Sequence, residues 1–190
     1  MKSLRVITVF VLMSTHVMGG RGLAGPSRLR FTETSITESG HVDGTEFDQR
    51  PVTRGYGFGY VADCDFGIHV TSLWTSSSGV PNPGITTAEM RHMYLDASWT
   101  RTVFGGYLLL TGGIGLGILG SLRYRIGDDT RAVSETSDFH GTAWFLGPGV
   151  ALGPLEVYWI YRRNFPAYGT PDGVLAMSSR HYQLGVGYRL

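Results

Sequence analysis

The chain has 190 residues, of which only 16% are charged, while glycine fills 28 positions. This length suits one domain, and the low charge excludes a disordered chain, whose composition is strongly charged. A formal net charge of +1 gives no electrostatic footprint for nucleic acid, so no such partner is expected. The single cysteine, Cys64, excludes an intrachain disulfide and a cysteine-based metal cluster, and we expect no metal and no cofactor.

The first predicted element is a secretory signal peptide over residues 1–25. Lys2 and Arg5 give it a positive start, Val6–Met13 is a short apolar run, and small residues follow. That order is typical of a signal peptide, and the apolar run is too short to span a bilayer. The chain is therefore expected to be exported, with one mature domain over residues 26–190.

Behind this segment, apolar residues alternate with small or polar ones in successive stretches. A period of two places the two sets on opposite faces of a β-strand. The stretches predict strands over Arg54–Ala62, Phe66–Thr75, His92–Arg101, Val103–Leu122, Thr142–Leu152, Leu155–Asn164 and Tyr182–Leu190. An eighth is expected over Leu29–Glu38, where alternation is poorest, because a membrane barrel closes with an even number of strands.

The segment Val103–Leu122 has no charged residue, so hydropathy alone predicts a transmembrane helix there. The alternative reading is a bitopic membrane protein anchored by this helix. Periodicity favours a strand, since Leu and Ile fall on even positions and most glycines on odd ones. Leu109 and Leu119 break the pattern but can pack inside a barrel, while Arg123 continues the odd, inward set.

The predicted connections alternate between long and short. Those rich in Gly, Pro, Asp and Ser are Gly40–Thr53, Ser77–Thr87, Gly127–Phe139 and Gly169–Met177. The tight ones are Asp63–Asp65, Thr102–Gly106 and Gly153–Pro154. Outer-membrane barrels show this asymmetry, with short periplasmic turns and longer outside loops. The fold predicted is therefore all-β: an eight-stranded antiparallel up-and-down transmembrane barrel, with Leu, Ile, Val, Trp and Tyr toward lipid.

On these residues the chain resembles the small outer-membrane β-barrel family that includes the transmembrane domain of OmpA. Tyr182–Leu190 is similar to the C-terminal signal read by the barrel-assembly machinery, with Tyr182, Leu184, Val186, Tyr188 and Leu190 on one face. That signal usually ends in an aromatic residue, and Leu190 departs from it. Leu155–Asn164 is similar to the family's penultimate strand, where a carboxylate and arginines project inward. The resemblance implies the bacterial outer membrane, lipopolysaccharide as neighbour and a monomer.

The predicted inward face carries the candidate functional residues. They are Asp96, Arg123, Arg125, Glu156, Arg162, Arg189, His69, His92, His181 and Gln183. An eight-stranded barrel is just wide enough for side chains to fill it. We therefore expect these side chains to form a hydrogen-bonded ionic plug. The functional alternative is that they line a narrow polar pore. The function predicted is a structural or surface-interaction role without enzymatic activity.

The main alternative is a lipid-A-modifying enzyme, an acyl hydrolase or transferase, on the same scaffold. Such chemistry needs a nucleophile, a base and an orienting carboxylate in contact. The nearest groupings are Ser137, Asp138 and His140, then Ser179 with His181, and His41 with Asp43. None matches the His-x-Ser-Asn pattern associated with lipid A deacylase barrels. A metal shared by His69, His92 and His181 has no fixed ligand spacing to support it.

Overall fold

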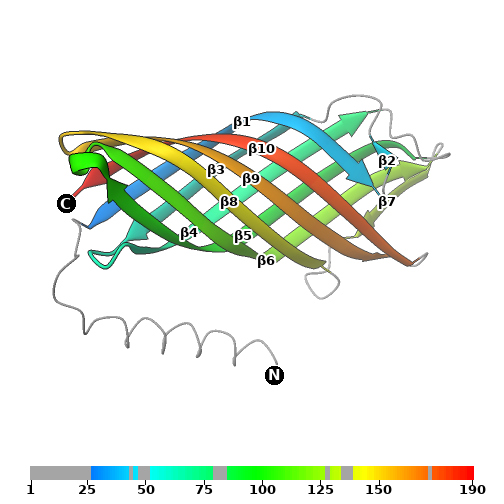
Figure 1. The fold of residues 1–190 in the computed structure, drawn as a ribbon. Helices are drawn as coiled ribbons and strands as arrows, with labels where there is room; N and C mark the ends of the chain where they lie inside the picture. Colours follow the sequence, from blue (N-terminus) through cyan, green and yellow to red (C-terminus); the bar gives the residue numbers. More distant parts are fainter. Residues whose placement is uncertain are drawn as a thin grey trace, which may run out of the picture.

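The described part of the chain forms tilted antiparallel strands that close into one barrel (Figure 1). The computed structural model describes residues 27–42, 45–46, 52–78, 85–126, 129–133, 139–170 and 173–190. The signal peptide predicted over residues 1–25 lies outside the described residues. All eight predicted wall strands are present, so the sequence identified the strands of the barrel.

Ten strands share one sheet. The wall consists of β1 (Arg28–Val42), β3 (Val52–Val61), β4 (Phe66–Ser78), β5 (Ile85–Val103), β6 (Leu108–Ile126), β8 (Phe139–Leu152), β9 (Leu155–Thr170) and β10 (Gly173–Arg189). The other two are β2 (Thr45–Glu46) and β7 (Asp129–Val133), which pair only with β1 and β6. The last strand returns to the first: β10 pairs with β1 from Arg28↔Arg189 to Val42↔Met177. Closure gives each of the eight wall strands a paired neighbour on both sides, as hydrocarbon requires.

The uncharged segment over residues 103–122 is not a helix. β5 ends at Val103, the short 3₁₀ helix η2 (Phe104–Gly106) makes the turn, and β6 follows. β6 pairs with β5 on one side and with β8 on the other. Among the described residues, no helix is both long and apolar enough to cross a membrane. The bitopic alternative is therefore wrong, because the alternation of large and glycine residues builds a strand.

A bulge in β6 changes which residues face inward beyond it. Met93 pairs with Leu119 and Tyr94 with Gly117, so Ile118 is the extra residue. An extra residue reverses the alternation that follows. Leu119 is consequently 45% exposed on the outer face, and Leu122 is 1% exposed inside. The expectation that Arg123 faces the lumen is wrong for the same reason, since its side chain is exposed outside.

The side chains of the first strand alternate strictly between the two faces of the wall from Arg28 to Thr34. Its pairing with β10 shifts between Thr34 and Ile36 and again between Thr37 and Ser39. Both shifts begin within residues 29–38, the stretch in which the sequence alternates most poorly. Before them, Arg28, Arg30, Thr32 and Thr34 are buried, whereas Glu33 lies on the exposed face.

The tight turns gather at one end of the barrel, here called the turn end, where the chain also finishes at Leu190 (Figure 1). The opposite, loop end carries β2 and β7. There the expectation of a long loop over Gly169–Met177 is wrong: β9 runs to Thr170, β10 begins at Gly173, and these two residues pair. Composition suggested a loop, but strand pairing reaches Thr170 on one side of residues 171–172 and Gly173 on the other.

The outer face of the wall is apolar. Phe58, Ile68, Leu146 and Val186 are between 47% and 64% exposed, and Trp74, Trp99, Trp144 and Trp159, the four tryptophans of the chain, are 39–52% exposed. A soluble barrel places such residues inside. Here they form a belt of the kind that faces lipid in transmembrane barrels.

Candidate functional site

The lumen is lined by polar and charged side chains that are shielded from solvent. Arg28, Glu156 and Arg162 are at most 1% exposed, and Asp96 is 2% exposed. Buried charges need partners, because desolvation costs several kcal/mol for each unpaired ion. The partners define three levels, taken here from the turn end to the loop end.

The level at the turn end is an ionic cluster around Glu156 of β9. Its Oε1 accepts hydrogen bonds from Arg189 Nε at 2.6 Å and Arg28 Nε at 3.1 Å. Its Oε2 accepts one from the Tyr158 hydroxyl. Arg28 also donates to Asp65 Oδ1 at 3.3 Å in the β3–β4 turn. The cluster ties the start of β1, the end of β10 and β9 together where the barrel closes.

Arg30 lies next to this cluster and is held without a carboxylate partner within the described residues. It donates to Thr100 Oγ1 at 2.8 Å and Thr111 Oγ1 at 3.0 Å. Its guanidinium lies 3.9 Å from the centre of the Tyr158 ring. A cation over an aromatic face is stabilised by the ring quadrupole, which partly replaces the missing counter-ion.

The middle level is a bidentate ion pair between Asp96 of β5 and Arg162 of β9. The Arg162 guanidinium donates to Oδ2 at 2.7 Å and to Oδ1 at 2.9 Å. Thr71 donates to Asp96 Oδ2 at 2.6 Å, and Arg162 Nε donates to Asn164 Oδ1 at 2.7 Å. The pair crosses the barrel, because β5 and β9 are not neighbours in the sheet. It therefore obstructs the lumen with a fixed network.

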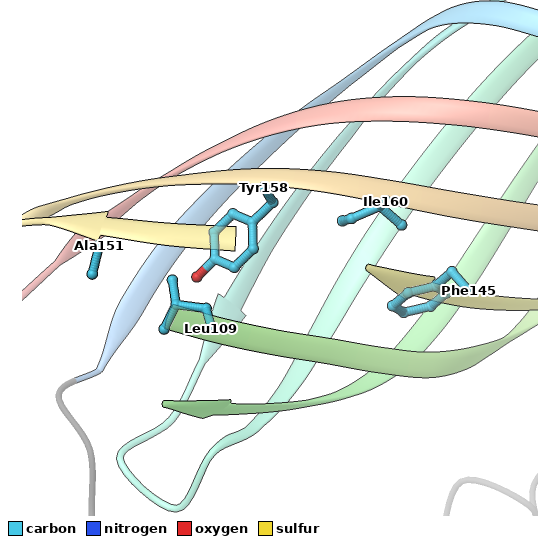
Figure 2. Packing of buried hydrophobic residues seen from close by; sticks show 5 residues of the cluster. All are labelled: Leu109, Phe145, Ala151, Tyr158 and Ile160. Atoms are coloured by element: carbon cyan, nitrogen blue, oxygen red, sulfur yellow. The ribbon is translucent and has the colours of Figure 1, made fainter. Parts of the chain in front are cut away.

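Smaller polar contacts flank this pair. His69 and Ser98 are 2.6 Å apart, and Gln183 Nε2 donates to Thr34 Oγ1 at 2.9 Å. Apolar side chains share the interior with them: Figure 2 shows Leu109, Phe145, Ala151, Tyr158 and Ile160, which are all at most 6% exposed.

The level at the loop end is an aromatic cluster. His92 stacks on Phe139 with ring centres 5.6 Å apart, Phe139 lies 5.2 Å from Tyr168, and Tyr94 meets Phe139 edge-on at 6.5 Å. The buried apolar side chains of Met90 and Leu122 extend this cluster inside the barrel toward the loop end. Offset and edge-on ring contacts add to the area that they bury. The lumen thus holds the ionic cluster of Glu156 beside apolar side chains at the turn end, and rings fill it at the loop end.

Most of the predicted lumen residues lie inside the barrel. Those that are buried are His69, His92, Asp96, Glu156, Arg162, His181 and Gln183. Arg189 is half-buried and bonded to Glu156, whereas Arg123 lies outside and the side chain of Arg125 is not described. Sequence reasoning missed Arg28 and Arg30. Their alternation with the outward Leu29 and Phe31 was the signal that could have found them.

The candidate catalytic groups do not meet as a triad in the described residues. Ser137, Asp138 and Asp43 lie outside the described part of the chain, as does the side chain of His41. His140 is exposed on β8. Ser179 Oγ and His181 Nε2 are 2.7 Å apart, with His181 buried inside the barrel. The described residues contain no group of three or more His, Cys, Asp or Glu that could hold a metal ion.

Comparison with solved structures identifies the fold. Neisserial surface protein A is similar over 88% of this chain and 99% of its own, with a TM-score of 0.63 and 14% identity. The fold is that of a small bacterial outer-membrane barrel. The attachment invasion locus protein Ail of Yersinia pestis is similar over 87% of this chain and 99% of its own, with a TM-score of 0.55 and 17% identity.

Ail in complex with the heparin analogue sucrose octasulfate is a further similar structure. It matches 87% of this chain and 100% of its own, with a TM-score of 0.51 and 16% identity. Neither a protein-family model nor a curated protein matches the sequence. The similarity is therefore one of architecture, and the lumen contacts above belong to this chain's own residues.

Proposed function

We propose that the protein is a monomeric, non-conducting barrel of the bacterial outer membrane that displays its loop end at the cell surface for attachment. The observation that carries the proposal is the filled lumen. The Glu156 cluster, the Asp96–Arg162 pair and the ring cluster at Phe139 occupy successive levels. Ions crossing the barrel would have to break these networks, so a scaffold role fits the interior better than transport.

The length of the strands supports a surface role. A tilted strand of about 9–11 residues spans the hydrocarbon core, yet β5 and β6 have 19 residues each. The turns lie close to the apolar belt, so the excess length projects from the loop end. A barrel inserted with its short turns in the periplasm then carries this rigid extension into the medium.

The proposed route to the membrane uses both ends of the chain. Residues 1–25 act as a cleaved signal peptide, and the barrel-assembly machinery reads Tyr182–Leu190. Leu184, Val186, Tyr188 and Leu190 of that segment are 47–66% exposed on the outer face, where another protein can contact them before insertion. Their neighbours Gln183, Gly185 and Gly187 point inward.

Surface attachment also agrees with the names of the similar structures, a surface protein and an attachment and invasion protein. Since Ail was solved with a heparin analogue, sulfated saccharides are the first ligands to test on this chain. Cells that display the protein should bind immobilised heparin analogue above cells with an empty vector. Equal binding would remove the support for a sulfated ligand.

The closed-lumen proposal is tested by recording currents across planar bilayers that contain the refolded protein. No stepwise conductance is expected, and steady single-channel openings would overturn the proposal.

Orientation is tested by a peptide tag inserted between Thr170 and Gly173, which antibodies should reach on intact cells. Mass spectrometry of lipid A should find the same acylation with and without the protein; a lost or gained acyl chain would favour the enzyme instead.

A further inference from the structure

Two arginines face outward and directly oppose each other near the loop end. Arg163 of β9 and Arg180 of β10 are register partners. Their chain neighbours Arg162 and His181 are 1% exposed inside the barrel, so the two guanidinium groups extend from the outer face. Like charges in directly opposed positions destabilise a sheet. A pair placed this way points to a bound anion that offsets the repulsion.

The surroundings of this pair are aromatic. Trp144 of β8 is the register partner of Arg163 on the other side of β9. The Arg163 guanidinium lies 5.0 Å from the centre of the Phe165 ring. Nε of Arg163 is buried and makes no hydrogen bond. Within the described residues neither arginine has an ion pair with a carboxylate. Among the side chains that the structure describes, the charge of the pair is therefore unmatched.

The pair lies at the outer boundary of the apolar belt. Ten residues separate Leu190 at the turn end from Arg180, and at about 3.3 Å per residue and a tilt near 45° they rise roughly 23 Å. The apolar band of such barrels is about 25 Å tall. Between these ends the outward residues of β10 are Tyr182, Leu184, Val186 and Tyr188. Arg180 thus meets the level where hydrocarbon ends and lipid headgroups begin.

A second row of the same composition lies across the barrel. Arg54 of β3 pairs with Trp74 of β4, and Trp74 pairs with Arg91 of β5. All three side chains are exposed. In the ring of eight wall strands, β4 and β9 are four places apart in either direction. This row also has outward carboxylates nearby, Glu33 and Glu89. Among the described side chains, the greater unmatched charge of the two rows is therefore at Arg163 and Arg180.

We propose that Arg163 and Arg180 together bind a phosphate group on the headgroup of an outer-leaflet glycolipid. Guanidinium groups match phosphate oxygens in a forked, charge-assisted geometry, and two of them on adjacent strands neutralise a phosphate dianion. Trp144 and Phe165 suit the boundary between acyl chains and sugars. The inference rests on the proposed outer-membrane placement, with the loop end outside.

The test measures binding of lipid A to the refolded barrel in neutral detergent micelles. Lipid A with its phosphates is compared with the same lipid after enzymatic dephosphorylation, for wild type, Arg163→Gln, Arg180→Gln and the double variant. The matched control is Arg101→Gln. Arg101 is an exposed arginine at the turn end, and its guanidinium lies 6.0 Å from the centre of the Trp99 ring. It has no arginine opposite, because it pairs with Leu110.

Each substitution in the pair should weaken binding of the phosphorylated lipid about tenfold or more, and leave the dephosphorylated lipid unchanged. Arg101→Gln should stay within about twofold of wild type. Equal affinity of wild type and double variant for the phosphorylated lipid would overturn the proposal. Displacement of the lipid by an equal concentration of inorganic phosphate would also overturn it, because the ligand would then be a free anion.

Two further readouts keep this inference separate from the proposed function. Without phosphorylated lipid, Arg180→Gln should unfold no more easily than wild type, since it relieves a like-charge contact; a loss of folding would assign the pair a structural role instead. If the barrel shows no conductance and its tag is accessible on intact cells, but it binds phosphorylated and dephosphorylated lipid A equally, this inference alone is overturned. Stepwise conductance or an inaccessible tag would count against the proposed function.

Discussion

Removing both partners of the Asp96–Arg162 pair should destabilise the barrel much less than the sum of the losses caused by removing each partner alone. Asp96→Leu leaves the buried Arg162 guanidinium with Asn164 as its hydrogen-bond partner in the described residues, beside the Tyr94 and Phe145 rings. It also leaves the Thr71 hydroxyl without its acceptor. The side chains of the pair are 1% and 2% exposed, so water cannot replace the lost contacts.

The magnitude follows from this geometry. Two unit charges about 4 Å apart attract by about 4 kcal/mol at an effective dielectric constant near 20, and breaking a buried pair typically costs about 3–5 kcal/mol. We expect each of Asp96→Leu and Arg162→Leu to lower the free energy of unfolding by about 3 kcal/mol or more. The double variant removes both charges and should cost about 2–4 kcal/mol less than the sum of the single changes.

The assay is urea unfolding in lipid vesicles, followed by tryptophan fluorescence and by the gel shift between folded and heated protein. Glu33→Leu is the control, because that carboxylate lies on the outer face without an ion pair in the described residues. It should leave stability unchanged or raise it, since carboxylates facing lipid are unfavourable. Additivity of the two lumen substitutions within about 0.5 kcal/mol would refute the coupling.

Three further outcomes follow from other parts of the barrel. Gly147→Ala should cost more than about 2 kcal/mol, because the added methyl would lie against the Trp159 carbonyl oxygen and 2.7 Å from Ile160 Cα. Gly112→Ala should change the free energy of unfolding by under about 1 kcal/mol, because its methyl meets Leu146 Cδ1 at 3.3 Å and the Phe145 carbonyl oxygen at an ordinary 3.6 Å. Leu190→Phe should raise the fraction of heat-modifiable protein in outer-membrane extracts, and an unchanged fraction would show that assembly does not read this position. Tyr168→Ala should show no conductance in bilayer recordings, because the Glu156 cluster and the Asp96–Arg162 pair still fill the lumen between the rings and the turn end. Channel openings would mean that the rings alone close the lumen.

The strands were predictable because each follows a local rule. In Tyr182–Leu190 the large residues lie on one face and Gln183, Gly185 and Gly187 on the other, and the structure keeps that division. The same rule failed wherever the register shifts. Nothing in the alternation of β6 reveals that Ile118 is an extra residue, so Arg123 was assigned to the wrong face.

The contacts in the lumen could not be predicted in the same way. Asp96 and Arg162 are 66 residues apart, and Arg28 and Glu156 are 128 apart. Which arginine meets which carboxylate depends on strand stagger and on the circumference of the closed barrel, which are properties of the whole sheet. The sequence could identify the inward residues, while their pairing required the three-dimensional arrangement.

The placement of the four tryptophans gives the most direct test of the central claim that the outer face of a closed barrel lies in lipid. Each tryptophan is at least 39% exposed on that face. In vesicles, phospholipids with brominated acyl chains should quench most of the tryptophan fluorescence, while aqueous iodide should quench little. In variants that retain a single tryptophan, brominated acyl chains should quench Trp159 more strongly than Trp144, which pairs with Arg163 near the headgroup level. Strong quenching by iodide with none from brominated lipid would contradict the account.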